Sequence, residues 1–228
     1  MDISLHYLEK GRGTPLLLLH GNGEDLSYFE HQIDHFSTSY KVIAIDTRGH
    51  GLSPRGERPF TIRQFAEDLL GFMDQHGIAK AHILGFSDGG NIALIFASHH
   101  PDRVDHLILN GANLYGSGVK PSVQIPIIIG YHIAKIFARI SRQARENAEM
   151  LGLMVNDPNI NPEELKRITN KTLVIVGDKD MIREKHTKLI CDNLPNAKLA
   201  ILPGDHFIAR KSPFAFNRTV EQFLVTEA

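Results

Sequence analysis

Short, continuously apolar runs alternate with longer segments of helical periodicity along most of this chain. Residues 16–19 are four leucines, and residues 173–176 read Leu-Val-Ile-Val. Runs without polar residues are typical of strands that are covered on both faces, as in parallel sheets. Because parallel strands need long crossover connections that are usually helices, the alternation predicts an α/β protein. We expect a mostly parallel twisted sheet with helices on both faces.

The expected strands lie at residues 3–8, 15–19, 41–46, 81–84, 104–110, 172–176 and 197–202. Helices are expected between them. The clearest covers residues 61–76, where Thr61 is a favourable N-cap and apolar residues recur on one face. A last helix is expected from Ser212, which is followed by a proline at the first helical position, to about Leu224.

The length of 228 residues suits a single α/β domain over residues 1–228. One region, residues 112–170, breaks the alternation because it contains no clear strand. Its core, residues 127–154, is rich in Ile, Phe and Met at helical spacing. An insertion at this point would cover the carboxyl ends of the strands, where open α/β sheets bind ligands, so we interpret it as a small helical lid. The alternative is an ordinary pair of core helices, whose apolar faces would look the same.

The net charge and the apolar pattern argue against nucleic acid and membranes as partners. A formal net charge of −1 gives no electrostatic reason to expect nucleic acid or an acidic membrane surface. The strongest apolar stretch, residues 125–140, contains a proline and two basic residues and is too short to span a bilayer. With one cysteine, Cys191, and no visible secretory signal, we expect a cytoplasmic protein without an internal disulfide. The expected partner is a small molecule, and the oligomeric state stays open.

The pentapeptide Gly85-Phe86-Ser87-Asp88-Gly89 joins an apolar run to a helical pattern. A strand that turns sharply into a helix around such a serine is a nucleophile elbow. The serine takes a strained backbone conformation at the tip, and a Cβ on either flanking glycine would collide with the neighbouring strand or helix. The turn exposes the serine hydroxyl and directs a helix N-terminus toward developing negative charge. The pattern therefore predicts Ser87 as a nucleophile.

A serine nucleophile needs a neighbouring base. Among the 13 histidines, His206 lies in a turn-forming stretch between the last expected strand and the last expected helix, at the sheet edge where Ser87 also lies. The loop after the preceding strand offers an acid to orient the imidazole. Asp180 lies far enough past that strand to reach the next loop, and Asp178 is the alternative.

The stretch His20-Gly21-Asn22-Gly23 follows the expected strand at residues 15–19. Two glycines around one residue leave its backbone N–H free to point into a cavity. The N–H groups of Asn22 and Asp88 are therefore a candidate two-donor oxyanion hole, and loss of one such donor costs about two to three orders of magnitude in rate. We expect His20 to pack behind this loop.

His31 and His35 have the i,i+4 spacing of a metal-binding helix face. The apolar residues Phe29, Ile33 and Phe36 already define the buried face, so both histidines are expected to face solvent. No third ligand suggests itself. We therefore expect no metal site.

Together these motifs resemble those of serine-dependent members of the α/β-hydrolase fold superfamily, close to its esterase and carboxylesterase branches. The matching segments spread over nearly the whole chain in the family's order; they are His20-Gly21-Asn22-Gly23, Asp46-Thr47-Arg48-Gly49-His50-Gly51-Leu52-Ser53, Gly85-Phe86-Ser87-Asp88-Gly89-Gly90, Gly177-Asp178-Lys179-Asp180 and Gly204-Asp205-His206. In the family the acid often takes the fourth place of the G-x-x-D pattern, here Asp180, and the chain order Ser87, Asp180, His206 is that of the family's triads. Relatives that dehalogenate alkyl halides or open epoxides carry aspartate in place of Ser87, so that branch is not expected.

The resemblance implies an enzyme that cleaves a small carboxylic ester through an acyl-enzyme intermediate. Ser87 would be the nucleophile, His206 the base and Asp180 the acid, with the N–H groups of Asn22 and Asp88 as the oxyanion hole. No cofactor is implied, because side chains and backbone complete the chemistry. Two alternatives stay open. One is the same triad acting on an amide, a thioester or a carbon–carbon bond, and the other is a hydrolase-like ligand receptor with little turnover.

Overall fold

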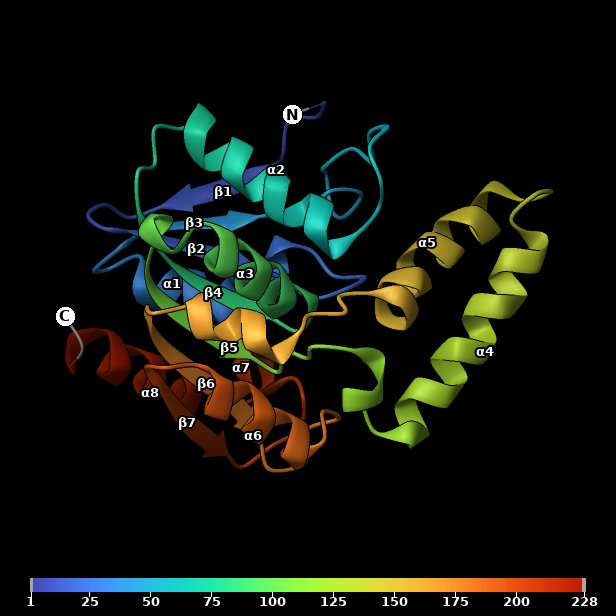
Figure 1. The fold of residues 1–228 in the computed structure, drawn as a ribbon. Helices are drawn as coiled ribbons and strands as arrows, with labels where there is room; N and C mark the ends of the chain where they lie inside the picture. Colours follow the sequence, from blue (N-terminus) through green and yellow to red (C-terminus); the bar gives the residue numbers. More distant parts are fainter. Residues whose placement is uncertain (1, 227–228) are drawn as a thin grey trace.

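The computed structural model describes residues 2–226, which form a seven-stranded sheet between layers of helices (Figure 1). The strand order is β1-β3-β2-β4-β5-β6-β7, in which β1 pairs with β3 antiparallel and every other neighbouring pair is parallel. The strands are β1 (Tyr7–Lys10), β2 (Pro15–Leu19), β3 (Lys41–Ile45), β4 (Ala81–Phe86), β5 (Val104–Asn110), β6 (Lys171–Gly177) and β7 (Ala197–Leu202). The predicted mostly parallel sheet is thus confirmed.

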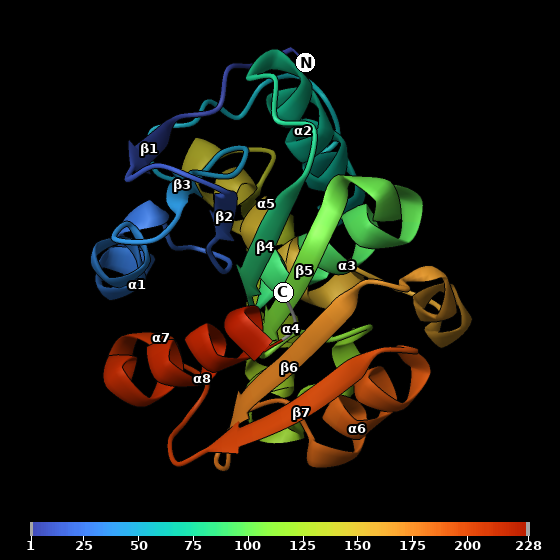
Figure 2. The same ribbon diagram turned by 90° about the vertical axis from the view of Figure 1, so that its left-hand side faces the viewer.

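Helices α2, α3 and α6 cover one face of the sheet, and α1, α7 and α8 cover the other (Figure 2). The predicted helix over residues 61–76 is α2, and the Thr61 hydroxyl accepts a hydrogen bond from the backbone N–H of Gln64 at its start. The α-helices are α1 (Glu30–Phe36), α2 (Ile62–Gln75), α3 (Asp88–His99), α4 (Pro121–Phe137), α5 (Arg142–Asn156), α6 (Glu184–Asn193), α7 (Ile208–Lys211) and α8 (Pro213–Thr226). Short 3₁₀ helices are η1 (Leu26–Phe29), η2 (Pro101–Arg103), η3 (Gly116–Gly118) and η4 (Pro162–Arg167).

The consecutive leucines of β2 divide between two hydrophobic cores. Leu17 and Leu19 pack in the core that contains the apolar faces of α2 and α3. Leu16 and Leu18 pack in the core that contains those of α1 and α8. Because successive side chains of a strand point to opposite faces, a strand with helices on both sides is apolar at every position. This two-sided burial explains the run of leucines.

The first strand lies later in the chain than the expected residues 3–8, because β1 begins only at Tyr7. Leu5 is buried in the same core as α2, and Ile3 packs against that core. The alternation of these apolar residues thus reflects burial of the incoming segment and not pairing with a neighbouring strand. Pairing of β1 starts where Tyr7 meets Ile45, and β1 is exposed along its length as an edge strand.

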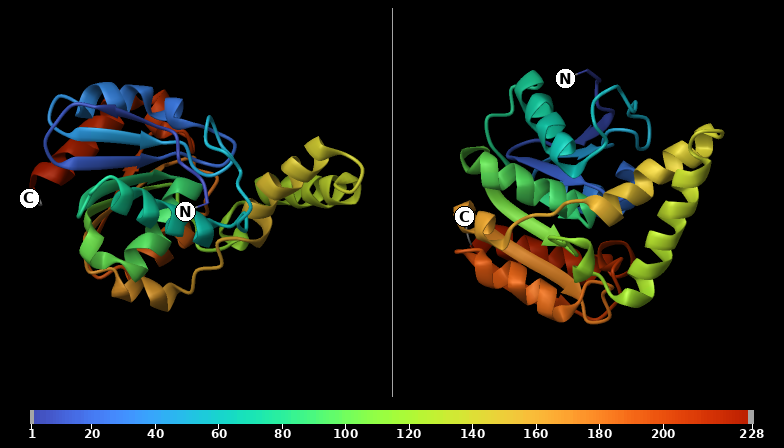
Figure 3. Two further views of the ribbon diagram at one scale, coloured as in Figure 1. Left: turned by 90° about the horizontal axis from the view of Figure 1, so that it is seen from above. Right: turned by 45° about the vertical axis from the view of Figure 1, so that its right-hand side comes forward.

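Helices α4 and α5, which we call the helical arm, form an antiparallel pair that projects from the sheet beyond the carboxyl end of β5 (Figures 1 and 3). They lie within residues 112–170, so this region is helical as expected, and its role as a lid stays a prediction. Large exposed apolar side chains follow one another along α4: Ile125, Ile129, Ile133, Ile136 and Phe137, with Ile140 just beyond its end. Helix α4 is apolar, but no helix among residues 2–226 is long and apolar enough to cross a membrane.

Polar contacts join the helical arm to the rest of the fold. Arg55, in the loop between β3 and α2, forms a bidentate ion pair with Glu149 of α5 at 2.8 and 2.6 Å. The side-chain amide of Asn22 donates a hydrogen bond to the main-chain carbonyl of Met150 at 2.7 Å. The arm is therefore attached to two loops at the carboxyl edge of the sheet.

Candidate active site

The pentapeptide from Gly85 to Gly89 forms a sharp turn between β4 and α3. Ser87 has φ 52° and ψ −116°, a conformation that costs a non-glycine residue on the order of 1–3 kcal/mol. A Cβ on Gly85 would collide with the backbone of Gly89, and a Cβ on Gly89 would collide with the carbonyl group of Leu19. Close backbone approach therefore explains both glycines, and it holds Ser87 at the carboxyl edge of the sheet.

Ser87, His206 and Asp180 come from three separate loops and meet at this edge. Nε2 of His206 lies 3.1 Å from Oγ of Ser87, and Nδ1 of His206 lies 2.8 Å from Oδ1 of Asp180. His206 and Asp180 are each only 4 % exposed, whereas Ser87 is partly exposed. A serine hydroxyl thus contacts an imidazole whose other nitrogen faces a carboxylate, which is the arrangement that activates a nucleophile.

The two candidate acids have different partners. Oδ1 of Asp180 also accepts a hydrogen bond from the backbone N–H of Ile182 at 2.8 Å, which fixes the carboxylate beside His206. Asp178 is exposed, and its Oδ1 accepts a hydrogen bond from the backbone N–H of Gly204 at 2.9 Å. The geometry therefore assigns Asp178 to the turn that precedes His206 and brings Asp180 to the imidazole.

Aromatic packing and one glycine shape the space around His206. The ring centroid of Phe86 lies 4.8 Å from that of the His206 imidazole. The ring of Tyr28 stacks on Phe86 with a centroid distance of 4.2 Å and an interplanar angle of 6°. Gly111 follows β5 with φ +65°, and a Cβ there would lie 2.6 Å from Cε1 of His206. Sequence reasoning did not identify these residues. The position of Gly111 directly after an expected strand could have pointed to it. Nothing in the sequence indicates that Tyr28 stacks on Phe86.

The candidate oxyanion donors lie on two neighbouring loops. Because β2 and β4 are adjacent and Leu19 pairs with Gly85, the loop that holds Asn22 emerges beside the turn that holds Asp88. Asp88 is the first residue of α3, so its N–H has no partner within the helix. His20 packs behind the first loop as expected: its Nδ1 lies 2.7 Å from the carbonyl oxygen of Gly21, and its Nε2 accepts the backbone N–H of Thr47.

Two carboxyl groups beside these loops are held toward their neutral form. Burial raises the pKa of Asp88 to about 7, against a hydrogen bond from Asn91 that lowers it. Burial likewise raises the pKa of Glu24 to about 7. In both side chains one carboxylate oxygen is buried without a hydrogen-bond partner among the described residues. Two carboxyl groups beside the candidate site therefore ionise less readily than free carboxyl groups.

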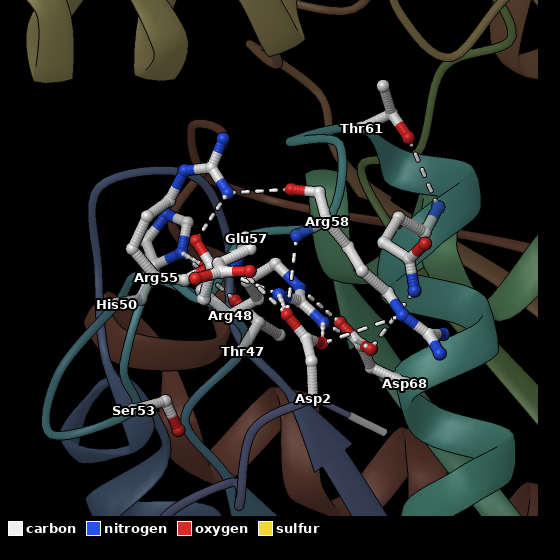
Figure 4. Close-up of polar contacts among 12 residues, drawn as sticks. Asp2, Thr47, Arg48, His50, Ser53, Arg55, Glu57, Arg58, Thr61 and Asp68 are labelled. Carbon is white, nitrogen blue, oxygen red and sulfur yellow. Dashed lines mark hydrogen bonds and ion pairs between the residues drawn. The ribbon is translucent and has the colours of Figure 1, made fainter.

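The segment from Asp46 to Ser53 is held by a buried cluster of charges (Figure 4). The guanidinium group of Arg48 is fully buried and donates to both oxygens of Asp68, at 2.6 and 2.7 Å. It also contacts Asp2 at 2.6 Å. Burial lowers the pKa of His50 to about 4, so this imidazole is neutral at pH 7. The contacts of Arg48 with Asp68 and Asp2 thus hold this segment to α2 and to the start of the chain.

His31 and His35 do not converge on a common point. His31 lies 3.6 Å from Glu30, and His35 lies 3.7 Å from Glu221, with both imidazoles well exposed. Each histidine thus has its own acidic neighbour at the surface.

Comparison with known proteins agrees with the fold described above. Residues 14–126 match the alpha/beta hydrolase fold family. The 3-oxoadipate enol-lactonase 2 of Acinetobacter baylyi is 26% identical over 248 residues, which cover 96% of this chain and 92% of that protein. An enol-lactonase structure from Burkholderia xenovorans has a TM-score of 0.82 at 24% identity, covering 98% of this chain and 97% of that one. A hydrolase structure from Pseudomonas aeruginosa has a TM-score of 0.78 at 28% identity, covering 97% and 94%. The chain therefore belongs to the α/β-hydrolase fold superfamily.

Proposed function

We propose that this protein is a serine hydrolase that cleaves small carboxylic esters through an acyl-enzyme intermediate. The proposal is carried by the contacts of His206, whose two nitrogens lie 3.1 Å from Ser87 Oγ and 2.8 Å from Asp180 Oδ1. The similar proteins named as enol-lactonases support an ester substrate, because a lactone is a cyclic ester.

In the acylation step, Oγ of Ser87 attacks the ester carbonyl carbon while Nε2 of His206 accepts the hydroxyl proton. Asp180 fixes the imidazole tautomer and stabilises the imidazolium that forms. The backbone N–H groups of Asn22 and Asp88 bind the negative oxygen of the tetrahedral intermediate. His206 then donates its proton to the departing alcohol, and the acyl group stays on Ser87.

In the deacylation step, His206 removes a proton from water, which attacks the acyl carbon. The same two N–H groups bind the second tetrahedral intermediate. Collapse of this intermediate releases the carboxylic acid and returns the proton from His206 to Ser87. The cycle consumes one water molecule and needs no other reactant.

A fluorophosphonate probe, which phosphonylates activated serines, tests the nucleophile. Wild-type protein should be labelled, Ser87→Ala should not, and Ser122→Ala, which changes an exposed serine of the helical arm, should be labelled like wild type. Labelling that survives in Ser87→Ala would refute the assignment of the nucleophile.

A panel of p-nitrophenyl esters of increasing acyl length tests the reaction. We expect turnover of the short esters by wild type and a loss of at least about 10³-fold in kcat/KM for Ser87→Ala. Labelling by the probe without turnover of any ester would leave the nucleophile intact and overturn the ester substrate. Amide, thioester and vinylogous diketone substrates would then be compared directly.

A further inference from the structure

We propose that His82, Asp105 and His106 form a binding site for a divalent transition-metal ion, with Zn²⁺ as the matching ion. These residues lie near the amino ends of β4 and β5, whereas Ser87 follows the carboxyl end of β4. The proposed site is therefore separate from the candidate active site, and the inference does not depend on the proposed function.

The three candidate ligand atoms form a triangle of the right size. Nδ1 of His82 lies 3.2 Å from Nδ1 of His106, and the same Oδ2 atom of Asp105 lies 3.6 and 3.7 Å from these two nitrogens. A triangle with these edges has a circumscribed radius of about 2.0 Å, which is the length of a Zn–N or Zn–O bond. The three atoms are thus spaced so that one ion can contact all of them.

A β-bulge brings the three side chains together. Ala81 pairs with Val104 and Ile83 pairs with Leu107, so His82 alone faces both Asp105 and His106. In a regular strand two consecutive side chains point to opposite faces, but at a bulge two residues oppose one and a side chain is redirected. This irregularity explains how neighbours in sequence can act as ligands of the same ion.

Both imidazoles are buried and packed against aromatic rings. The ring of Tyr40 packs against His82, and the ring of Phe223 packs edge-on against His106, each with a centroid distance of 5.6 Å. His82 and His106 are 6 % and 5 % exposed. A dry shell that orients imidazole ligands is typical of metal sites in proteins.

The carboxylate of Asp105 is oriented by Lys80 and lies where solvent can reach the proposed site. Nζ of Lys80 lies 3.4 Å from Oδ1 of Asp105, so the lysine engages one oxygen while Oδ2 faces the histidines. The Asp105 side chain is 39% exposed, which opens the site to solvent on one side. Water can therefore enter as a fourth ligand and complete a tetrahedral shell. Two nitrogens and one carboxylate oxygen are donors that suit Zn²⁺.

Titration of the full chain with Zn²⁺, in competition with a chromophoric chelator, tests this site. Wild type should bind one Zn²⁺ that His82→Asn, His106→Asn and Asp105→Asn each bind at least about tenfold more weakly, because each variant loses a ligand. Asp102→Asn, an exposed neighbour in η2, and His206→Asn, at the other edge of the sheet, should bind Zn²⁺ like wild type.

Thermal unfolding with and without Zn²⁺ provides the second measurement. A ligand that binds only the folded state raises the Tm, so Zn²⁺ should raise the Tm of wild type and of both controls but not that of the three ligand variants. Asp105→Asn changes a half-exposed side chain, and it keeps the test valid if either histidine variant fails to fold. Absence of saturable Zn²⁺ binding to wild type, or equal affinity in wild type and the ligand variants, would overturn the proposal.

Discussion

The side-chain amide of Asn22 donates a hydrogen bond to the main-chain carbonyl of Met150 at 2.7 Å, and this contact joins the candidate oxyanion loop to the helical arm. The backbone N–H of Asn22 and its side chain thus have separable roles. The N–H would bind the oxyanion, while the side chain links the loop to the arm.

The variant Asn22→Ala separates these roles because it keeps the backbone N–H. We expect kcat/KM for a short p-nitrophenyl ester to fall by less than about tenfold, mainly through a higher KM, since the main effect is a looser arm. Asn147→Ala, which changes an exposed residue of α5, serves as the control. A loss of about 10²-fold or more in kcat at unchanged KM would contradict this view and give the side-chain amide a direct role in the transition state.

Strain at Ser87 predicts a stability difference between two inactive variants. Glycine adopts a positive φ at little cost, whereas alanine does not, and Ser87 has φ 52°. Ser87→Gly should therefore unfold at a higher urea concentration than Ser87→Ala, by about 1 kcal/mol in the free energy of unfolding. Equal or higher stability of the alanine variant would show that the elbow is not strained in solution.

The two candidate acids should respond differently to conversion to asparagine. Asp180→Asn disturbs the tautomer of His206 and should lower kcat by about 10³- to 10⁴-fold. Asp178→Asn retains an acceptor for the N–H of Gly204, so its kcat should stay close to that of wild type. Steady-state kinetics of both variants measures these values of kcat. A large loss in Asp178→Asn with little change in Asp180→Asn would make Asp178 the acid.

The raised pKa of Asp88 predicts how stability changes with pH. Because its pKa is about 7 in the folded protein against 3.8 for the unperturbed group, the folded state binds the proton more tightly than the unfolded chain. Ionisation therefore costs stability as the pH rises from the unfolded to the folded pKa. Relative to Asp88→Asn, wild type should lose roughly 1–3 kcal/mol between pH 5 and pH 8, measured by urea unfolding.

Asp25 provides a control, because its pKa is shifted in the opposite direction from that of Asp88. Hydrogen bonds from Ser27 lower its pKa, so Asp25 is ionised in both the folded and the unfolded states between pH 5 and pH 8. The stability difference between wild type and Asp25→Asn should therefore stay constant over this range. A constant difference for Asp88→Asn as well would refute the argument from burial.

The charge cluster around Arg48 predicts that one carboxylate, Asp68, has a large effect on stability. Asp68→Ala removes both oxygens that bind the buried guanidinium group and should cost about 3–5 kcal/mol in the free energy of unfolding. Asp74→Ala breaks an ion pair with Arg103 in which the Asp74 side chain is 60% exposed, and it should cost less than about 1 kcal/mol. Similar losses in the two variants by denaturant titration would argue against a special role for burial.

Much of the fold could be predicted because two-sided burial leaves a direct trace in the sequence. The bounds of β2, β5 and β7 match the predicted ones. In β2 and β5 this follows from burial on both faces, whereas β7 is a partly exposed edge strand whose end is marked by the turn residues that follow it. At Ile3 and Leu5 the same reasoning was wrong because burial does not require pairing with another strand. The bulge at His82 could not be predicted, because register depends on both strands at once.

Part of the candidate site could also be predicted from the sequence, and part of it could not. Positions after strand ends predicted that Ser87, Asp180 and His206 would lie at one edge, and their separations are those of hydrogen bonds. The direction of the helical arm could not be predicted, because periodicity identifies an apolar face without naming its partner. The contact between Tyr28 and Phe86 was also beyond prediction, since it joins segments far apart in the chain.

The aromatic stack also limits which sequences can occupy the elbow. In the G-x-S-x-G motif the residue before the serine is formally free to vary, yet here Phe86 fills it, packs in the buried core with Tyr28 and flanks the imidazole of His206. A smaller residue would leave a void in the core, and the same change would leave the imidazole without its neighbour. Tolerance to substitution at this position is thus set by three-dimensional packing, so the motif alone overstates the freedom available to evolution or to a protein engineer.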